Sequence, residues 1–104
     1  MERIAFTMTL FPGQAEEYRR RHEAIWPELA ALLKKSGISD YSIFLDPRTN
    51  TLFATLVRSA DHHMDVLAGH PVMRRWWDHM KDIMAHDDNG TPIVAPLEPM
   101  FHLD

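Results

Sequence analysis

The segment "YRRRHEAIWPEL", residues 18–29, places side chains that can exchange a proton inside a helical pattern. One face of that helix is formed by residues at spacings of four, three, four and three: Tyr18, His22, Ile25, Leu29 and Leu32. His22 therefore occupies a position where an apolar residue is expected, and Tyr18 is its direct helical neighbour. Because the ordinary pKa of histidine lies near neutrality, His22 is a candidate for general acid or base catalysis.

A second interpretation of His22 is a buried histidine whose only role is to donate to a backbone carbonyl. Three further aromatic residues favour a binding pocket: Tyr41, Trp76 and Trp77. Aromatic faces with a polar tip match the C–H surface and the hydroxyl groups of a sugar. Trp76 and Trp77 lie about 100° apart on a helix, so one can enter the core while the other borders a cavity. A tryptophan pair that simply fills the core is the alternative.

Pro27 falls within the same helical pattern. It cannot donate to the carbonyl of Glu23, and an unbroken helix would lose about 3 kcal/mol at this position. The residue before a proline also avoids helical backbone angles. We therefore predict a break, with one helix ending near Ile25 and a second helix starting with Pro27 at its first position.

The elements that position these residues follow from periodicity and from turn residues. Asp61 is predicted as a helix N-cap, and Pro71 suits the first turn of the helix that contains "VMRRWWDHMKDIM". Pro96 and Pro99 place the last strand on an edge. The predicted order is a strand at 3–10, a broken helix at 14–36, a hairpin of strands at 38–45 and 51–58, a helical region interrupted at "GHP", and a strand at 97–103.

This β-α-β-β-α-β order predicts one α+β domain over residues 1–104, a ferredoxin-like antiparallel sheet with helices on one face. The second face should be polar, yet Phe44 and Phe53 lie opposite the apolar residues that face the helices. We therefore expect the second face to be covered, either by the sheet of a second subunit or around a ligand cavity. Two sheets packed in this way form a dimeric α+β barrel.

Composition narrows the function classes. The net charge of −4 argues against a nucleic-acid partner. No apolar run approaches the ~20 residues needed to span a membrane, and the N-terminal segment lacks the pattern of a signal peptide. A chain without cysteines fits a cytoplasmic protein. The adjacent His62 and His63, like the other histidines, lack the spacing of a metal site, so we expect no metal and no cofactor.

Taken together, the segments "YRRRHEAIWPEL", "YSIFLD", "LFATL", "RRWWDHM" and "FHLD" resemble the L-rhamnose mutarotases, in the same order and at similar spacing over essentially the whole chain. The resemblance implies a homodimeric α+β barrel that interconverts the α and β pyranose forms of free L-rhamnose without cofactor or metal. It implies that His22 is the proton donor. It also implies four residues that contact the sugar: Tyr18, Tyr41, Trp76 and Trp77.

The chemistry of such a reaction suits these side chains. A proton must reach the ring oxygen while the anomeric hydroxyl loses one, and we expect His22 to act as the acid, with Tyr18, Tyr41 or a water relaying the other proton. Fold alone leaves other functions open, because the same barrel hosts cofactor-free monooxygenases and haem-degrading enzymes. A non-catalytic small-molecule-binding module, with His22 as a hydrogen-bond donor only, is the remaining alternative.

Overall fold

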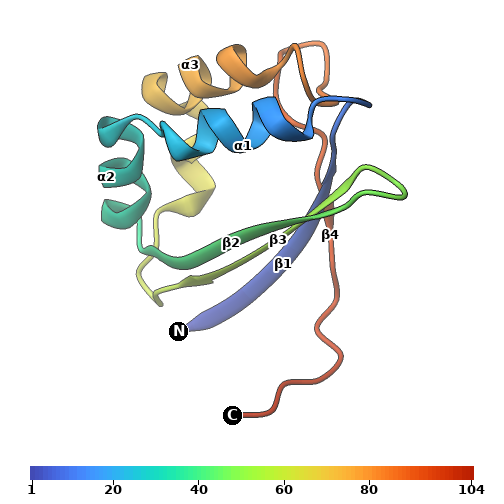
Figure 1. The fold of residues 1–104 in the computed structure, drawn as a ribbon. Coiled ribbons are helices and arrows are strands. Elements are labelled where there is room, and N and C mark those ends of the chain that lie inside the picture. The colour runs from blue at the N-terminus through green and yellow to red at the C-terminus, as the bar shows by residue number, and fades with distance from the viewer.

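A computed structural model describes all residues, 1–104, as one antiparallel sheet with every helix on the same side of it (Figure 1). None of these helices is long and apolar enough to cross a bilayer. In chain order the elements are β1 (Glu2–Thr9), α1 (Ala15–Glu23), α2 (Pro27–Lys35), β2 (Ile38–Asp46), β3 (Thr51–Arg58), the 3₁₀-helix η1 (Met64–Gly69), α3 (Pro71–Met80) and β4 (Ala95–Pro96).

The strands lie in the order β2-β3-β1-β4, and all neighbouring pairs are antiparallel. This order confirms the predicted ferredoxin-like α+β sheet with helices on one face. The predicted hairpin of β2 and β3 is also confirmed. Asn50, at its turn, has a φ of 58°, a left-handed angle that Asn tolerates better than most residues.

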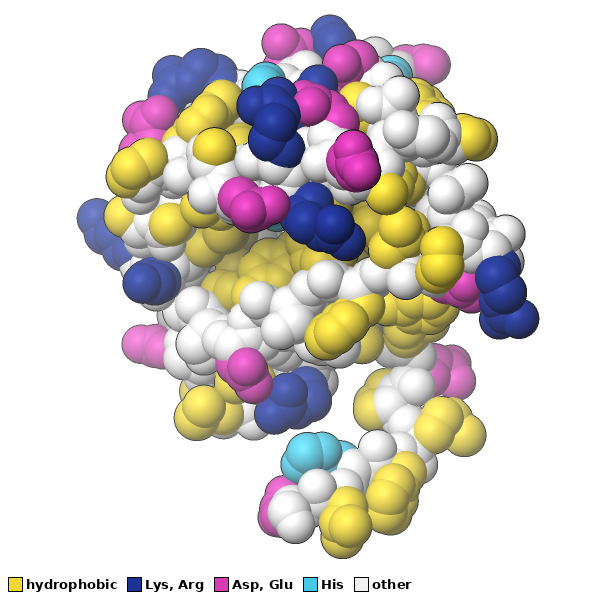
Figure 2. Space-filling model, in the orientation of Figure 1, with side chains coloured by type: hydrophobic (Ala, Val, Ile, Leu, Met, Phe, Trp, Pro, Cys, Tyr) yellow, Lys and Arg dark blue, Asp and Glu magenta, His cyan; other side chains and the backbone are white.

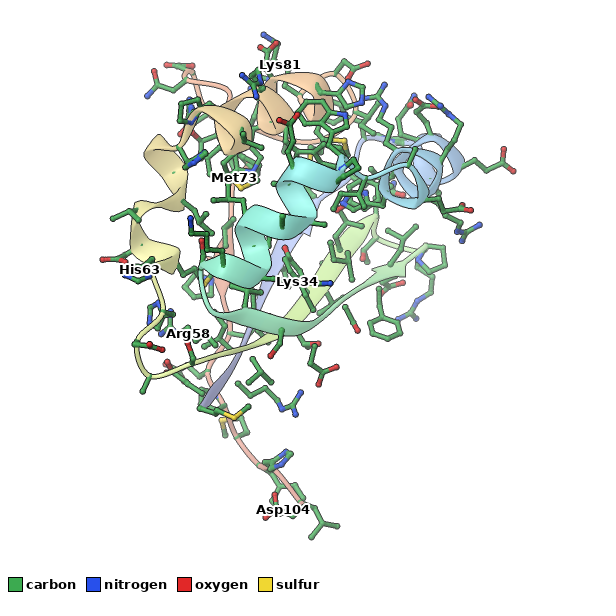
Figure 3. The ribbon with its side chains drawn as sticks, turned by 90° about the vertical axis from the view of Figure 1, so that its left-hand side faces the viewer. Lys34, Arg58, His63, Met73, Lys81 and Asp104 are labelled. Atoms are coloured by element: carbon green, nitrogen blue, oxygen red, sulfur yellow. The ribbon has the colours of Figure 1, made fainter.

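The core lies between the sheet and the helices. Alternate residues of β3 point into it, and Leu52, Ala54 and Leu56 are at most 2% exposed. Leu29 of α2 and Met80 of α3, each 1% exposed, close it from above. Full burial of one such large side chain stabilises the fold by about 1.5–3 kcal/mol. In Figure 3, Met73 of α3 lies in the interior, while Lys81, just beyond the end of α3, projects outward.

The other face of the sheet carries apolar side chains that this chain does not cover. Phe44 and Phe53 form a cross-strand pair there, and they are 66% and 40% exposed. The side-chain pattern of the two faces therefore follows the sequence prediction. The second subunit that would cover this face remains a prediction.

Asp61 is not a helix N-cap, so that prediction is wrong. It lies in a turn, and η1 begins three residues later at Met64. Two backbone bonds hold the intervening segment against the end of α2: Ser59 N donates to Gly37 O at 2.9 Å, and His63 N donates to Ser36 O at 2.8 Å. These bonds hold the segment in a non-helical conformation, and η1 begins only after the last of them.

Pro71 occupies the first turn of α3, as predicted, but α3 ends at Met80 rather than continuing through "KDIM". The reason is tertiary: Ile83 O accepts from Phe11 N at 2.9 Å, and Met84 forms a β-bridge with Leu10. Those bonds require a non-helical backbone after Met80.

The predicted strand at 97–103 is wrong for the single chain. Only Ala95 and Pro96 pair with β1, followed by one bond from Leu97 N to Ala5 O at 3.0 Å. Pro96 and Pro99 have no N–H to continue a ladder. β4 does lie at the sheet edge, as expected, and beyond it the chain runs away from the body to Asp104 (Figures 1 and 3).

Candidate active site

The predicted break at Pro27 is present. Helix α1 ends at Glu23, and α2 begins with Pro27 in its first turn. Trp26, between them, has φ −62° and ψ 130°, the extended conformation expected before a proline. The break lets Trp26 turn toward α3, where its ring packs edge-to-face on Trp76 with centroids 5.2 Å apart. Pro27 therefore shapes one side of the aromatic cluster.

His22 is fixed by three contacts. Its Nδ1 lies 3.0 Å from the backbone carbonyl oxygen of Tyr18. Its ring stacks on the Tyr18 ring with centroids 4.3 Å apart, and it meets Trp76 edge-to-face at 5.4 Å. Since a carbonyl oxygen can only accept, Nδ1 must carry the proton of that bond. Nε2 is therefore the nitrogen left to exchange a proton with a ligand.

Burial lowers the pKa of His22 below its ordinary value of 6.5, and the bond to the Tyr18 carbonyl partly offsets this shift. Desolvation disfavours the charged imidazolium, whereas the carbonyl stabilises it. The neutral ring is therefore the main form at neutral pH. When it is protonated, it is a stronger acid than a free histidine.

The two tyrosine hydroxyls are neutral in this site. Tyr18 is 8% exposed, and burial, followed by the nearby Tyr41, raises its pKa well above the usual 10. Burial raises the pKa of Tyr41 to about 12, although 39% of the residue remains exposed. Both hydroxyls can therefore donate and accept hydrogen bonds. Neither is suited to act as a tyrosinate base near neutral pH.

Tyr41 reaches the site through a β-bulge that the sequence analysis did not predict. The pairing of β2 with β3 shifts between Ser39 and Ser42, and Asp40 in the bulge has a φ of 48°. The extra residue places both Ile38, which is 4% exposed, and Tyr41 on the helix-facing side of β2 despite their odd spacing. There the Tyr41 ring packs on Phe6 with centroids 6.5 Å apart.

Trp76 and Trp77 divide their roles as the helical geometry predicts. Trp76 is 5% exposed and belongs to the core cluster, and its ring meets that of His22 edge-to-face. Trp77 is half-buried, and the guanidinium of Arg74 lies 5.4 Å from its ring centroid. The Trp76 ring thus contacts His22, whereas the Trp77 ring contacts Arg74.

All five predicted site residues line one continuous hollow, whose lining also includes Phe44 on the uncovered face of the sheet. Figure 2 shows its apolar interior and charged side chains around the opening. Its volume is about 1690 Å³, which exceeds a pocket for a single small ligand because it continues to the C-terminal segment around Phe101. No group of three or more histidine and acidic side chains is placed to hold a metal ion.

Several further residues lie at this site and were not predicted from the sequence. Arg19 and Glu23 line the hollow, and the ring of His79 packs on Trp26 and Trp76. Arg19 and Arg20 are both exposed. The signal for His79 was its spacing of three from Trp76, which places the two on the same side of α3.

Comparison with known proteins agrees with this fold. A family model described as L-rhamnose mutarotase matches residues 3–103. The chain is 63% identical over 103 residues to the L-rhamnose mutarotase of Verminephrobacter eiseniae, covering 99% of this chain and 97% of the relative. It is 60% identical over 104 residues to that of Burkholderia cenocepacia, with both chains covered completely.

The crystal structure of L-rhamnose mutarotase from Formosa agariphila superimposes with a TM-score of 0.93 at 45% identity, and the match covers 100% of both chains. The names of these proteins do not favour the monooxygenase, haem-degrading or binding-module interpretations. Sequence, length and fold agree, and the chain belongs to the L-rhamnose mutarotase family.

Proposed function

We propose that this chain interconverts the α and β pyranose anomers of L-rhamnose, with His22 as the proton donor. Family membership over the whole length supports the reaction and the sugar. The observation that carries the role of His22 is its geometry. Nδ1 is held by the Tyr18 carbonyl at 3.0 Å, and the ring lies between Tyr18 and Trp76 on the wall of the hollow.

The proposed reaction needs only proton transfers. Nε2–H of the His22 imidazolium gives its proton to the ring oxygen, the anomeric hydroxyl loses its own proton, and the bond between C1 and the ring oxygen breaks to give the open-chain aldehyde. Rotation about C1–C2 presents the other face of the aldehyde, and the C5 hydroxyl adds back to C1 while the protons return. Nothing is oxidised and no group leaves, so a positioned acid can contribute about 10²- to 10⁴-fold.

The state of His22 suits both directions of transfer. Its lowered pKa makes the imidazolium a ready donor, and the neutral ring that remains can take the proton back when the ring closes. The Tyr18 carbonyl accepts from Nδ1 in both forms, so the ring keeps its orientation. This constancy matters because a misplaced catalytic group loses much of its effect.

The aromatic residues would bind the sugar. Tyr18 and Tyr41, as neutral phenols, offer hydroxyls that donate to and accept from the sugar hydroxyls or a relaying water. Trp76 and Trp77 offer apolar faces to the C–H groups of the pyranose. The acceptor of the anomeric proton would be a water held by the tyrosines, because a tyrosinate is disfavoured here.

A homodimer belongs to the same proposal. The exposed Phe44 and Phe53 would pack against the sheet of a second copy, since a long apolar sheet face in water is an association site. We also propose a cytoplasmic location, which a chain without cysteines fits.

Two-dimensional exchange NMR of the α and β anomeric protons of L-rhamnose at equilibrium tests the function. We expect exchange between the two signals to accelerate on adding the protein, and to stay at the buffer rate with a heat-unfolded sample. An unchanged exchange rate with folded protein would refute the proposal for this sugar.

A further inference from the structure

The three consecutive arginines beside His22 have different surroundings. Arg19 is exposed at the edge of the hollow. The side chain of Arg20 is 68% exposed and pairs with Glu17 one turn earlier on the same helix. The side chain of Arg21 is only 11% exposed. Arg21 is therefore the least exposed of the three arginines. It has no part in the proton transfers proposed above.

Arg21 uses its guanidinium to join α1 to the end of α3. Nε donates to Glu17 Oε2 at 2.7 Å, within α1. Nη1 donates to the backbone carbonyl of His79 at 2.6 Å and to Asp82 Oδ1 at 2.8 Å, and Nη2 donates to Asp82 Oδ2 at 3.1 Å. The pair with Asp82 uses two guanidinium nitrogens and both carboxylate oxygens, the geometry that fixes orientation as well as distance.

The carbonyl of His79 lies in the last turn of α3, which ends at Met80. Such carbonyls have no partner within their helix, and a cationic side chain that reaches them stabilises that end. Arg21 therefore holds α3 at its C-terminal end. The guanidinium binds the carbonyl of His79, before the last residue of α3, and the carboxylate of Asp82, after it. These two contacts leave the guanidinium little freedom to shift.

The helical turns that Arg21 joins also contain residues of the site. Arg21 directly precedes His22 on α1, and His79 follows Trp76 by three residues on α3. The ring of His79 packs on the Trp76 ring with centroids 5.6 Å apart, and Trp76 meets His22 edge-to-face at 5.4 Å. A shift of α1 relative to α3 would thus displace the proton donor from the aromatic wall.

We propose that Arg21 is a positioning residue that fixes His22 against Trp76 by tying α1 to the end of α3. The proposal that this matters for turnover rests on the proposed mutarotase function. Arg21 acts through geometry, because the groups that shift the pKa of His22 are its burial and the Tyr18 carbonyl and do not include Arg21.

The first test compares Arg21→Met with Arg20→Met. Both variants remove one guanidinium from neighbouring positions and leave an apolar stem, but only the first breaks the link to α3. Measured per folded protein, well below the unfolding temperature, Arg21→Met should lose about 10-fold or more in kcat, with KM changing much less, since small misplacements of catalytic groups are costly. Arg20→Met should keep wild-type values.

A conservative series covers the case in which Arg21→Met does not fold. Arg21→Lys keeps the charge but cannot make the two-pronged contact, and Asp82→Asn alters the other end of the link at a side chain that is 65% exposed. We expect each to lose severalfold in kcat, with the midpoint of the pH–rate profile unchanged. Unchanged kcat in both, even with a lower unfolding temperature, would reduce Arg21 to a structural role and overturn the proposal.

The His22 ring signals in NMR give a readout independent of activity. They can be identified by their loss in His22→Gln. Their ring-current shifts depend on Tyr18 and Trp76, so they should move in Arg21→Lys and Asp82→Asn and stay in Arg20→Met. An inactive wild-type protein would refute the mutarotase function, and these shifts would still decide the positioning. Unmoved signals in both link variants would contradict it.

Discussion

Nδ1 of His22 donates to the backbone carbonyl oxygen of Tyr18, four residues earlier on α1, across 3.0 Å. This is the bond that a purely structural buried histidine would make, and here it also leaves Nε2 as the ring nitrogen that can exchange a proton. The two interpretations of His22 are therefore compatible. The bond fixes the tautomer and the orientation, and the hollow supplies the place for a substrate.

The buried His22 makes stability depend on pH. Its pKa in the folded state lies below the 6.5 of an unfolded chain, so below pH 6.5 the unfolded state binds more protons. The stability that comes from its neutral form is fully present above pH 6.5 and is lost as the pH falls toward the lowered pKa. Urea unfolding of wild type between pH 7.5 and 5 should therefore show a decline that is reduced in His22→Gln. Carboxylates such as Glu17 and Asp82 titrate below this window.

His102→Gln provides the control for that pH effect, because the side chain of His102 is 62% exposed. It should keep the slope of the wild type. An equal slope in wild type and His22→Gln would show that His22 does not lose a proton on folding.

The hydroxyl of Tyr41 should matter for the sugar and little for the fold. Tyr41→Phe keeps the ring that packs on Phe6 but removes the group whose pKa is raised to about 12. Loss of one hydrogen bond to substrate is expected to lower kcat/KM about 10-fold, equivalent to about 1.4 kcal/mol. The unfolding free energy should change by less than about 0.5 kcal/mol. Wild-type kcat/KM in the variant would remove Tyr41 from the binding site.

The adjacent tryptophans should differ in how much they contribute to stability. Trp76→Ala empties a core position that is 5% exposed and should cost about 3–5 kcal/mol of unfolding free energy. Trp77→Ala removes a half-buried side chain and should cost clearly less, while weakening L-rhamnose binding measured by calorimetry. Equal losses of stability would contradict the difference in burial between the two side chains.

The bulge in β2, which places Tyr41 on the helix-facing side, can be tested through the backbone conformation of Asp40. Asp40 has a left-handed φ of 48°, where an alanine is strained and a glycine is not. Asp40→Ala should be less stable than Asp40→Gly by about 1 kcal/mol in chemical unfolding. The ion pair of Asp40 with Arg3, at 3.4 Å between exposed side chains, is lost in both and cancels from the comparison. Equal stability of the two variants would mean that Asp40 is not held in this conformation.

Much of this architecture follows from local patterns. The alternation of the strands and the missing N–H of Pro27 predict the sheet and the broken helix, and helical spacing brings Tyr18 and His22 together. The bulge at Asp40 escaped prediction because "SDYS" contains no glycine to mark a left-handed angle. The end of α3 and the unpaired C-terminal segment depend on partners far away in sequence, which local periodicity does not contain.

The contacts between α1 and α3 also lie beyond local patterns. Helical periodicity separates Arg19, Arg20 and Arg21 in direction but does not say which of them meets the end of another helix. The approach of Trp76 to His22 likewise depends on how α3 crosses the sheet. The roles of site residues on separate elements were therefore predicted from the family resemblance. The distances between these residues are known only from the structure.

We expect Nε2 of His22 to move the proton in anomer exchange. The most direct test of this role is exchange NMR of L-rhamnose with His22→Ala and His22→Gln, each first verified as folded. Acceleration over buffer should fall by about 10²-fold or more in both variants, the usual contribution of a general acid. Full acceleration by the His22→Ala protein would contradict this role and leave the catalytic proton to another group.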